Sequence, residues 1–310
     1  MKILVTGGAG FIGSHIVDAY LNDGHEVVVV DDLSTGNEDN VHRNARFHKM
    51  DIRDASLGEL FEKEQFDVVN HHAAQMDVRR SVADPLFDAS INVLGGLAVL
   101  ENARRYGVKK VIFASTGGAI YGEQETFPAD EGHPLRPLSP YGITKLCTEK
   151  YLDYYKVVHD LDSVVLRYAN IYGPRQNPHG EAGVVAIFAN KMIGHDQPLI
   201  NGDGKQTRDY TYVGDVVRAN LLALKHKGSE MFNVGTGKET DVITLFRKLK
   251  DILDPACPEE HGPAKEGEQR RSVIGYHKIN RMLGWSPTVN LDDGLALTAK
   301  YFREKGARTK

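Results

Sequence analysis

Four glycines lie within the first thirteen residues, directly after the apolar segment Lys2–Thr6 and at the start of an apolar-periodic stretch over 11–23. We predict a buried strand, a tight turn through Gly7 and Gly10, and a helix. Glycine permits so tight a turn, and at Gly13 it lets the helix pack closely on the sheet. The N–H groups at the start of such a helix attract an anion, so the segment is typical of a phosphate-binding turn.

A carboxylate follows the next predicted strand at the distance expected in dinucleotide-binding folds. Val27–Val30 leads into Asp31 and Asp32, and Asp31 lies 31 − 13 = 18 residues after Gly13, close to the ~20 of a ribose-binding acid. Asp31 can accept both ribose hydroxyls and would repel a 2′-phosphate, which favours NAD over NADP. Without this context, the glycines would indicate an ordinary turn and the acid a loop cap.

Strands and helices alternate through the first half of the chain. We predict strands over 2–6, 26–30, 46–48, 67–71, 110–115 and 163–168, and helices over 11–23, 56–64, 86–106 and 141–159. The apolar runs lack polar alternation, as expected of strands buried on both faces of a parallel sheet. The predicted fold class is therefore α/β, with a doubly wound, Rossmann-like parallel sheet.

The pattern changes after Arg167, where loops rich in glycine, asparagine and proline separate short elements. Such elements predict a smaller mixed α/β lobe beside the sheet. A helix over 213–225 and a strand over 231–234 indicate that the chain returns to the main domain. We therefore expect an NAD-binding domain made of residues 1–168 and about 209–238, and a smaller lobe made of residues 169–208 and 239–310.

Composition argues against several classes of function. With 38 Lys and Arg against 42 Asp and Glu, the net charge is −4, which does not favour a nucleic-acid or anionic-membrane binder. We find neither a signal peptide nor an apolar run near the ~20 residues of a membrane span. The two cysteines, Cys147 and Cys257, lie far apart, so we expect reduced thiols and a cytoplasmic protein. His71 and His72 lack metal-ligand spacing, and no metal is expected.

A tyrosine and a lysine four residues apart begin the helix predicted over 141–159. Tyr141 and Lys145 follow Ser139-Pro140 and share one face of that helix. A phenol titrates near pH 10, so lowering its pKa to ~7 requires about 4 kcal/mol of preference for phenolate. A lysine ammonium and a positively charged nicotinamide can supply this preference in a partly desolvated site. Alone, the pair is also compatible with a core tyrosine and a solvated lysine.

The motifs together resemble the extended short-chain dehydrogenase/reductase family, over roughly residues 1–302. Within that family the chain looks like the NAD-dependent UDP-glucose 4-epimerases. The resemblance rests on Gly7–Gly13, Asp51-Ile52, His72–Gln75 with Arg79–Ser81, Asn92, Ser115-Thr116 before Tyr121-Gly122, Tyr141 with Lys145, Arg167–Pro174, Asn201–Gly204, Thr207–Tyr210 and Leu283–Pro287.

This resemblance implies reversible C4 epimerisation of a UDP-hexose through a 4-keto intermediate, with tightly bound NAD. UDP-glucose and UDP-galactose are the expected pair, with UDP-N-acetylglucosamine tolerated because Ser272 is small. The implied catalytic residues are Tyr141, Lys145 and Thr116. The implied cofactor contacts are Gly7, Gly10, Phe11, Ile12, Gly13, Asp31, Asp32, Asp51, Ile52, Ala73, Ala74, Gln75, Asn92, Ser115, Tyr141, Lys145 and Tyr168. The smaller lobe would hold the UDP-sugar through Asn170, Val185, Asn201, Arg208, Lys265 and Glu268.

Two positions depart from the family pattern. Gly117 stands where most relatives carry the catalytic Ser or Thr, so the hydroxyl must come from Thr116 or Ser115, and we favour Thr116. Lys265 stands where relatives commonly carry an arginine against the β-phosphate, which keeps the charge and loses bidentate geometry. For Arg208, the alternative to a diphosphate contact is a surface salt bridge with Asp209.

The sequence leaves alternatives to an epimerase open. Ala119 stands where nucleotide-sugar dehydratases typically carry an acid, so dehydration is disfavoured. A dehydrogenase with net redox turnover and a non-catalytic NAD-binding scaffold are the alternatives to an epimerase. The resemblance further implies that the helices over 86–106 and 141–159 pair across a two-fold axis in a homodimer, although they could simply cover the sheet.

Overall fold

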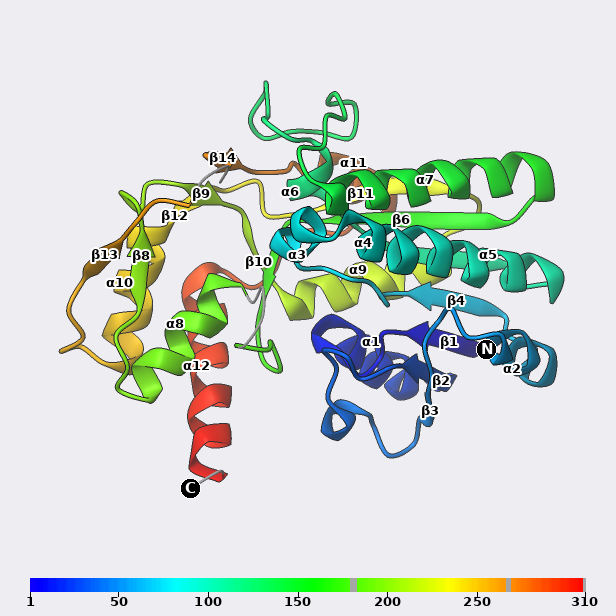
Figure 1. Ribbon diagram of the computed structural model, residues 1–310, viewed down its shortest axis with the longest axis horizontal. Coiled ribbons are helices and arrows are strands. Elements are labelled where there is room, and N and C mark those ends of the chain that lie inside the picture. Colours follow the sequence, from blue (N-terminus) through cyan, green and yellow to red (C-terminus); the bar gives the residue numbers. More distant parts are fainter. Residues whose placement is uncertain (179–182, 266–268, 309–310) are drawn as a thin grey trace.

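A seven-stranded parallel sheet forms the centre of the computed structural model, which describes residues 1–178, 183–265 and 269–308 (Figure 1). The strand order is β11-β6-β5-β4-β1-β2-β3, so the order reverses between β1 and β4. Ligands of doubly wound folds bind at such a reversal, beyond the carboxyl ends of the strands. The strands are β1 (Lys2–Thr6), β2 (Glu26–Asp31), β3 (Arg46–Lys49), β4 (Val68–His71), β5 (Lys110–Thr116), β6 (Asp162–Tyr168) and β11 (Glu230–Val234).

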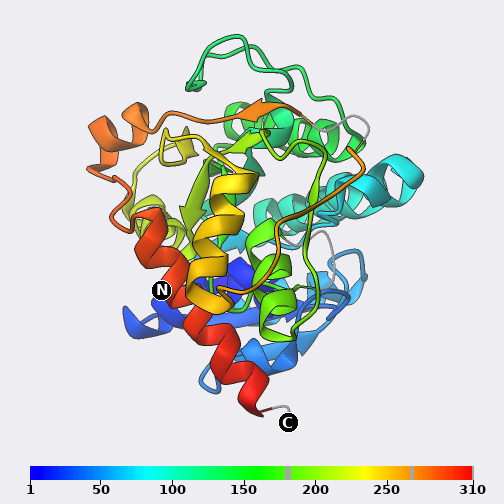
Figure 2. The same ribbon diagram turned by 90° about the vertical axis from the view of Figure 1, so that its left-hand side faces the viewer.

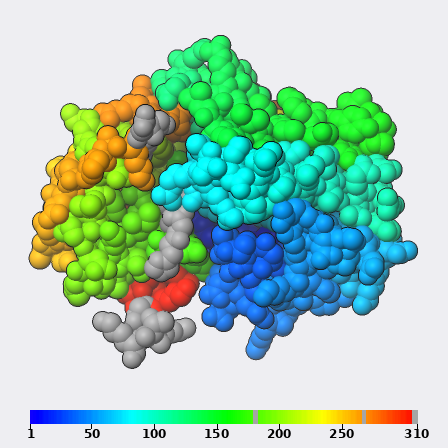
Figure 3. Space-filling model, in the orientation of Figure 1, coloured from blue at the N-terminus to red at the C-terminus, as the bar shows by residue number. Residues whose placement is uncertain are grey.

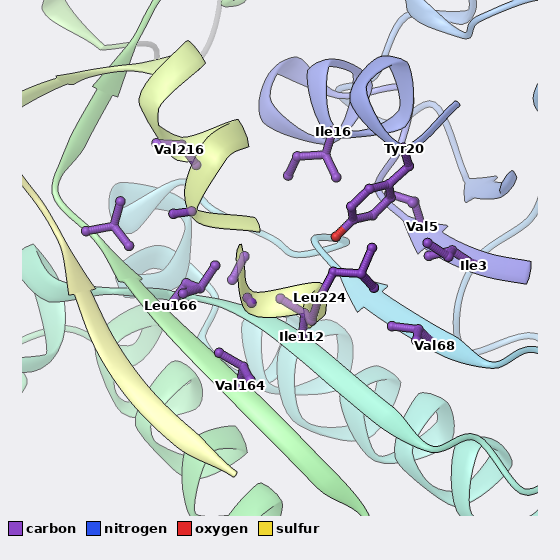
Figure 4. Close-up of a cluster of buried hydrophobic side chains, with 14 of the residues drawn as sticks. Ile3, Val5, Ile16, Tyr20, Val68, Ile112, Val164, Leu166, Val216 and Leu224 are labelled. Atoms are coloured by element: carbon purple, nitrogen blue, oxygen red, sulfur yellow. The ribbon is translucent and has the colours of Figure 1, made fainter. Parts of the chain in front are cut away.

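Helices cover both faces of this sheet and bury a separate apolar core on each. On one face, α1 (Phe11–Asn22) and α9 (Val213–Lys225) pack side chains such as Tyr20 and Val216 against the strands (Figure 4). The opposite face carries α2 (Ser56–Glu64), α5 (Gly96–Arg105) and α7 (Pro140–His159). The predicted doubly wound fold class is confirmed.

The predicted helix over 86–106 is interrupted. It consists of α4 (Pro85–Ala89), a π-helical segment η2 (Ser90–Gly95) and then α5. π-Helical segments are rare and often occur at functional sites. Three further short helices before β6 lie outside the helices predicted from the sequence: η1 (Glu38–Asn40), α3 (Val78–Ala83) and α6 (Gly117–Ile120). After Arg167, the helix over 213–225 was the one predicted by its bounds.

A smaller lobe follows β6 and has its own apolar core, built from side chains such as Phe188, Phe246 and Leu295. Its helices α8, α10 and α12 pack against one another (Figure 2). Trp285 is buried in the core of the main sheet, where its Nε1 donates to the carbonyl of Asp215 at 2.9 Å. The remaining elements are β7 (Asn170–Tyr172), α8 (Val184–Ile193), β8 (Leu199–Asn201), β9 (Thr207–Arg208), β10 (Tyr210–Tyr212), β12 (Thr240–Asp241), α10 (Val242–Leu253), β13 (Glu260–Gly262), β14 (Arg271–Ser272), α11 (His277–Leu283) and α12 (Leu291–Arg308).

Both Cys147 and Cys257 are free thiols. Among the described helices, none combines the length and the apolar character that a bilayer crossing requires.

Candidate active site

The glycine turn forms a close-packed cradle at the carboxyl end of β1. Gly7 has φ +71°, and its N–H donates to the carbonyl of Val30 at 2.8 Å. A Cβ on Gly13 would lie 2.2 Å from the carbonyl oxygen of Gly7, so only glycine allows α1 to sit this close to the turn. Gly10 caps α1, and the first turn of that helix carries no acidic residue. The cradle therefore fits a pyrophosphate, because backbone N–H groups and the helix dipole face the anion.

The surface is hollowed beside this cradle. In the space-filling view, the dark-blue N-terminal segment lies recessed next to the cyan segment that contains α3 and α4 (Figure 3). Phe11 and Ile12, at the start of α1, are half-buried, as are Ala73 and Ala74 after β4. The predicted cofactor residues of β1 and β4 thus meet at the switch point of the sheet.

Of the three predicted adenosine-side acids, Asp31 lies deepest. Its carboxylate accepts from the backbone N–H groups of Ala9 at 3.0 Å and Leu33 at 2.9 Å, and burial raises its pKa. Asp32 is exposed and accepts from the backbone and hydroxyl of Ser34.

Asp51 and Ile52 follow β3. Asp51 pairs with Arg53, which lowers the pKa of that carboxyl. Ile52 is buried against Gly95, where a Cβ would come within 2.7 Å of the isoleucine side chain. The Ile52 side chain therefore holds the loop after β3 against the π-helical segment.

The loop after β4 is held by side-chain bonds to the helix that follows. The Asn92 Oδ1 accepts from the backbone N–H of Gln75, and Asn92 Nδ2 donates to the Gln75 carbonyl, both at 2.9 Å. Ala73 donates its N–H to the hydroxyl of Thr6 at 3.2 Å. Asn92 therefore supports the predicted nicotinamide side of the site through the loop.

Lys145 is buried beside Tyr141 on α7. Its Nζ donates to the carbonyl of Ala114 at 2.9 Å and lies 6.0 Å from the centre of the Tyr141 ring. Burial lowers the pKa of Lys145 to about 8, whereas the carboxylates of Asp88 and Glu149 act to raise it. The amine is therefore mostly protonated at neutral pH, and its charge can stabilise a phenolate on Tyr141.

The two candidate hydroxyls at the end of β5 have different partners. The buried Ser115 hydroxyl donates to Glu149 at 2.5 Å, and Glu149 also forms a buried ion pair with Arg167 at 2.6 Å. The half-buried Thr116 hydroxyl accepts a long 3.3 Å bond from the N–H of Ala119, which caps α6. This bond leaves the hydroxyl proton of Thr116 available for donation, whereas that of Ser115 is committed to Glu149.

Two histidines and a tyrosine near the site form hydrogen bonds within the core. His71 bonds to the hydroxyl of Thr6 at 2.7 Å, and His72 bonds to that of Tyr168 at 3.1 Å. Burial and the charge of Lys145 lower the pKa of each histidine to about 3, so both are neutral. Tyr168, a predicted cofactor residue, is buried and stacks on His72.

The predicted diphosphate residues lie on the smaller lobe. Arg208 is half-buried on β9 and donates to the carbonyl of Thr207 at 2.8 Å. Asn170 is exposed at the start of β7, and Lys265 is also exposed. The carboxylate of Asp209 accepts from the backbone N–H of Thr236.

The predicted uridine residues also lie on this lobe. Val185 is buried in the core of the lobe on α8, and Asn201 is half-buried at the end of β8. Glu268 lies outside the described residues.

Three residues of the site were not predicted from the sequence: Asp88, Thr144 and Glu149. All three are buried polar side chains next to predicted site residues. One local signal was available: Asp88 and Asn92 are four residues apart and so share a helix face, and a pair of polar residues on a buried face indicates internal hydrogen bonding.

Residues 3–235 match the model of the NAD dependent epimerase/dehydratase family. The UDP-glucose 4-epimerase of Mycolicibacterium smegmatis is 44% identical over 311 residues, covering 98% of this chain and 99% of that protein. The crystal structure of UDP-glucose 4-epimerase with UDP-glucose from Thermotoga maritima superposes with a TM-score of 0.97 at 49% identity, covering 98% of this chain and 99% of that one. The crystal structure of the Thermus thermophilus UDP-glucose 4-epimerase in complex with NAD gives a TM-score of 0.93 at 44% identity, with the same coverage.

The family match, the full-length relatives and the glycine cradle agree with one another, and the resemblance inferred from the sequence motifs is confirmed. The chain belongs to the NAD dependent epimerase/dehydratase family.

Proposed function

We propose that this protein interconverts the C4 epimers of a UDP-hexose through a 4-keto intermediate, using tightly bound NAD. The observation that carries this function is the buried Lys145 amine, 6.0 Å from the centre of the Tyr141 ring. The pair lies at the carboxyl ends of the parallel strands, as does the glycine cradle after β1. A base and a dinucleotide cradle on one edge of the sheet suit oxidation of a carbinol carbon.

Three side chains would act on the sugar. The Tyr141 phenolate takes the proton from O4, and the Lys145 ammonium stabilises that phenolate electrostatically. The Thr116 hydroxyl donates a hydrogen bond to O4 and restrains it beside the base. When bound, the nicotinamide would supply the hydride acceptor for C4 and, once reduced, the hydride donor to the opposite face of the ketone. Tyr141 returns its proton to O4 in that second half, so that proton and hydride balance over the cycle.

In this proposal, residues 1–168 with 209–238 hold NAD, and residues 169–208 with 239–310 hold the nucleotide sugar. Arg208 offers a guanidinium fork to the diphosphate, with Asn170 and Lys265 beside it. Val185 and Asn201 border the uridine. Side chains such as Phe188 and Phe246 give the smaller lobe an apolar core of its own, which supports this division. Trp285 departs from it, because it packs in the core of the main sheet.

We propose UDP-glucose and UDP-galactose as the main substrates, with UDP-N-acetylglucosamine tolerated. The support for the N-acetyl sugar is Ser272, a small buried residue on β14. Its hydroxyl lies 3.5 Å from the position that a Cβ on Gly118 would occupy. A small side chain at this wall leaves room for an N-acetyl group.

The proposed reaction is tested by incubating purified protein with each nucleotide sugar and no added NAD, and then separating the 4-epimers by chromatography. We expect both epimers to approach the same equilibrium ratio from either side. Conversion that consumes added NAD stoichiometrically would instead identify a dehydrogenase. Loss of water from the sugar would identify a dehydratase, although Ala119 supplies no acid for that step.

We further propose that two copies associate through α7 and the α4–η2 segment. On α7, Ile143, Tyr151, Tyr154 and Val158 are exposed at helical spacing, and Leu86 and Leu94 are exposed on the adjoining helical segment. Cys147, Lys150, Tyr151 and Tyr154 line an open hollow of about 330 Å³. A second copy is the fitting occupant, because two helical stripes of this kind can cover each other across a two-fold axis.

We place the enzyme in the cytoplasm. Both cysteines are free thiols, which fits a reducing compartment. Activity recovered in the soluble fraction after gentle lysis would support this location, and activity in the secreted medium would contradict it.

A further inference from the structure

A buried carboxylate lies next to α7, the helix that carries Tyr141 and Lys145. Asp88 on α4 is fully buried. Its Oδ1 accepts from Gln75 Nε2 at 2.9 Å and from Asn92 Nδ2 at 3.0 Å, and its Oδ2 accepts from the hydroxyl of Thr144 at 2.8 Å. Burying a carboxylate costs free energy, which its three hydrogen bonds offset here. We therefore ask what this buried acid does at the site.

The three partners belong to three parts of the site. Gln75 lies in the loop after β4, Asn92 in the π-helical segment and Thr144 on α7, directly before Lys145. Asn92 also bonds to Thr144 at 3.2 Å, so the polar groups form one connected network. Asp88 therefore joins the loop on the predicted nicotinamide side to the helix that carries Tyr141 and Lys145.

Asp88 and Glu149 both lie buried near Lys145, but they differ in the charge of their partners. Glu149 is paired with Arg167 at 2.6 Å, so its charge is balanced within the core. The three groups that bond to Asp88 are all uncharged, and its carboxylate acts on the Lys145 ammonium through the Coulomb attraction. Opposite charges in a desolvated site favour the ionised form of each.

Lys145 is surrounded by groups from α7, α4, β4 and β5. They are Tyr141 and Glu149 on α7, Asp88 on α4, the neutral His71 and His72 at the end of β4, and Phe113 with the Ala114 carbonyl on β5. Arg167 of β6 is held by Glu149. The histidines do not change charge above pH 5, so an alkaline transition belongs to the Lys145–Tyr141 pair.

We propose that Asp88 is a positioning residue for the epimerisation: it fixes the loop after β4 to α7, and its negative charge favours the ammonium form of the neighbouring Lys145. This inference rests on the proposed function, because it gives Asp88 a task in the same reaction. It is separable from that function, since the charge state of Lys145 can be measured without turnover.

Asp88→Asn removes the charge and can keep the geometry. The amide oxygen can occupy the Oδ1 position, and its NH₂ can donate to Thr144, whose hydroxyl then turns to the Tyr141 carbonyl at 3.0 Å. The alkaline limb of the kcat–pH profile should move down by about one pH unit, with NAD still bound. The side-chain titration of Lys145, followed by NMR, should move in the same direction.

Asp84→Asn is the matched control, because Asp84 caps the same helix through the N–H of Phe87 and is exposed. It should leave both profiles unchanged. An unchanged Lys145 titration in Asp88→Asn would overturn the electrostatic part of the inference, as would an equal shift in the control. If the wild type shows no epimerase activity but the Lys145 titration still shifts, the proposed function fails, whereas the effect of the Asp88 charge on Lys145 stands.

Thr144→Val tests the link to α7 and leaves the carboxyl group of Asp88 in place. We expect kcat to fall about tenfold with no movement of the alkaline limb, and Thr144→Ser to restore it. Wild-type kcat in Thr144→Val would overturn the positioning role. This variant also decides that role if Asp88→Asn does not fold.

Discussion

At the scale of single residues, chemistry depends on one phenol and its neighbours. Tyr141→Phe removes the proposed base and keeps the ring, so we expect kcat to fall about 10²–10⁴-fold. The glycine cradle is untouched, and NAD should remain bound, which the absorbance of the purified protein can show. Tyr106→Phe, which changes a ring packed against Phe61 at the end of α5, is the control. Near-normal turnover in Tyr141→Phe would remove this residue from its role.

The two hydroxyls at the end of β5 should separate stability from catalysis. Thr116→Val removes a donor to O4, so kcat should fall about 100-fold while stability changes little. Ser115→Ala takes a hydrogen bond from the buried Glu149, so the free energy of unfolding should fall by about 1–3 kcal/mol with kcat close to wild type. Urea unfolding and steady-state kinetics measure the two effects. The opposite pattern would make Ser115 the catalytic hydroxyl.

At the scale of elements, the junction between β1 and α1 is the least tolerant of change. A Cβ at Gly13 would lie 2.2 Å from a backbone oxygen that cannot move without opening the turn. Gly13→Ala should therefore destabilise the protein by about 1–3 kcal/mol and release NAD on gel filtration. In Gly262→Ala, the new methyl would meet Leu199 at an ordinary 3.7 Å, so this variant should retain NAD. Retention of NAD in both variants would contradict the cradle.

The main sheet could be predicted from the sequence because its buried parallel strands appear as continuous apolar runs. Val27–Val30 and Val111–Phe113 are continuous apolar runs, and β2 and β5 occur there. The two-residue strands β9 and β12 show no such run, since their pairing depends on segments distant in the chain. Their existence follows from the tertiary fold.

The proposed catalytic pair could be predicted from its spacing together with the glycine turn, but the network around it could not. Tyr141 and Lys145 are one helical turn apart, which a sequence displays directly. Asp88 is 13 residues from Gln75 and 56 from Thr144. An acid in a helix is normally exposed, and the four-residue spacing from Asn92 is a weak signal, so the three-dimensional contacts are needed to show that this acid is buried.

At the scale of the whole molecule, a buried acid connects the two lobes. Asp209, between β9 and β10, accepts from the N–H groups of Thr236 and Gly237, which follow β11 of the main sheet. The same residue donates its N–H to the carbonyl of Ser272 on β14. Arg208, the proposed diphosphate contact, therefore precedes a residue that is fixed to the main sheet. This attachment can hold the diphosphate of the substrate in place while the 4-keto sugar rotates to present its opposite face for hydride return.

The proposed homodimer gives the last prediction. Tyr154 lies in the exposed stripe of α7, and at a two-fold interface each substitution appears twice. Tyr154→Arg would place two unpaired charges in a desolvated contact, so it should dissociate the dimer in sedimentation velocity experiments. Leu297→Arg changes a similarly exposed apolar side chain on α12, far along the chain in the smaller lobe, and should remain dimeric. A wild-type monomer, or equal dissociation in both variants, would contradict an interface formed by α7, because the stripe would then be ordinary solvent-exposed surface.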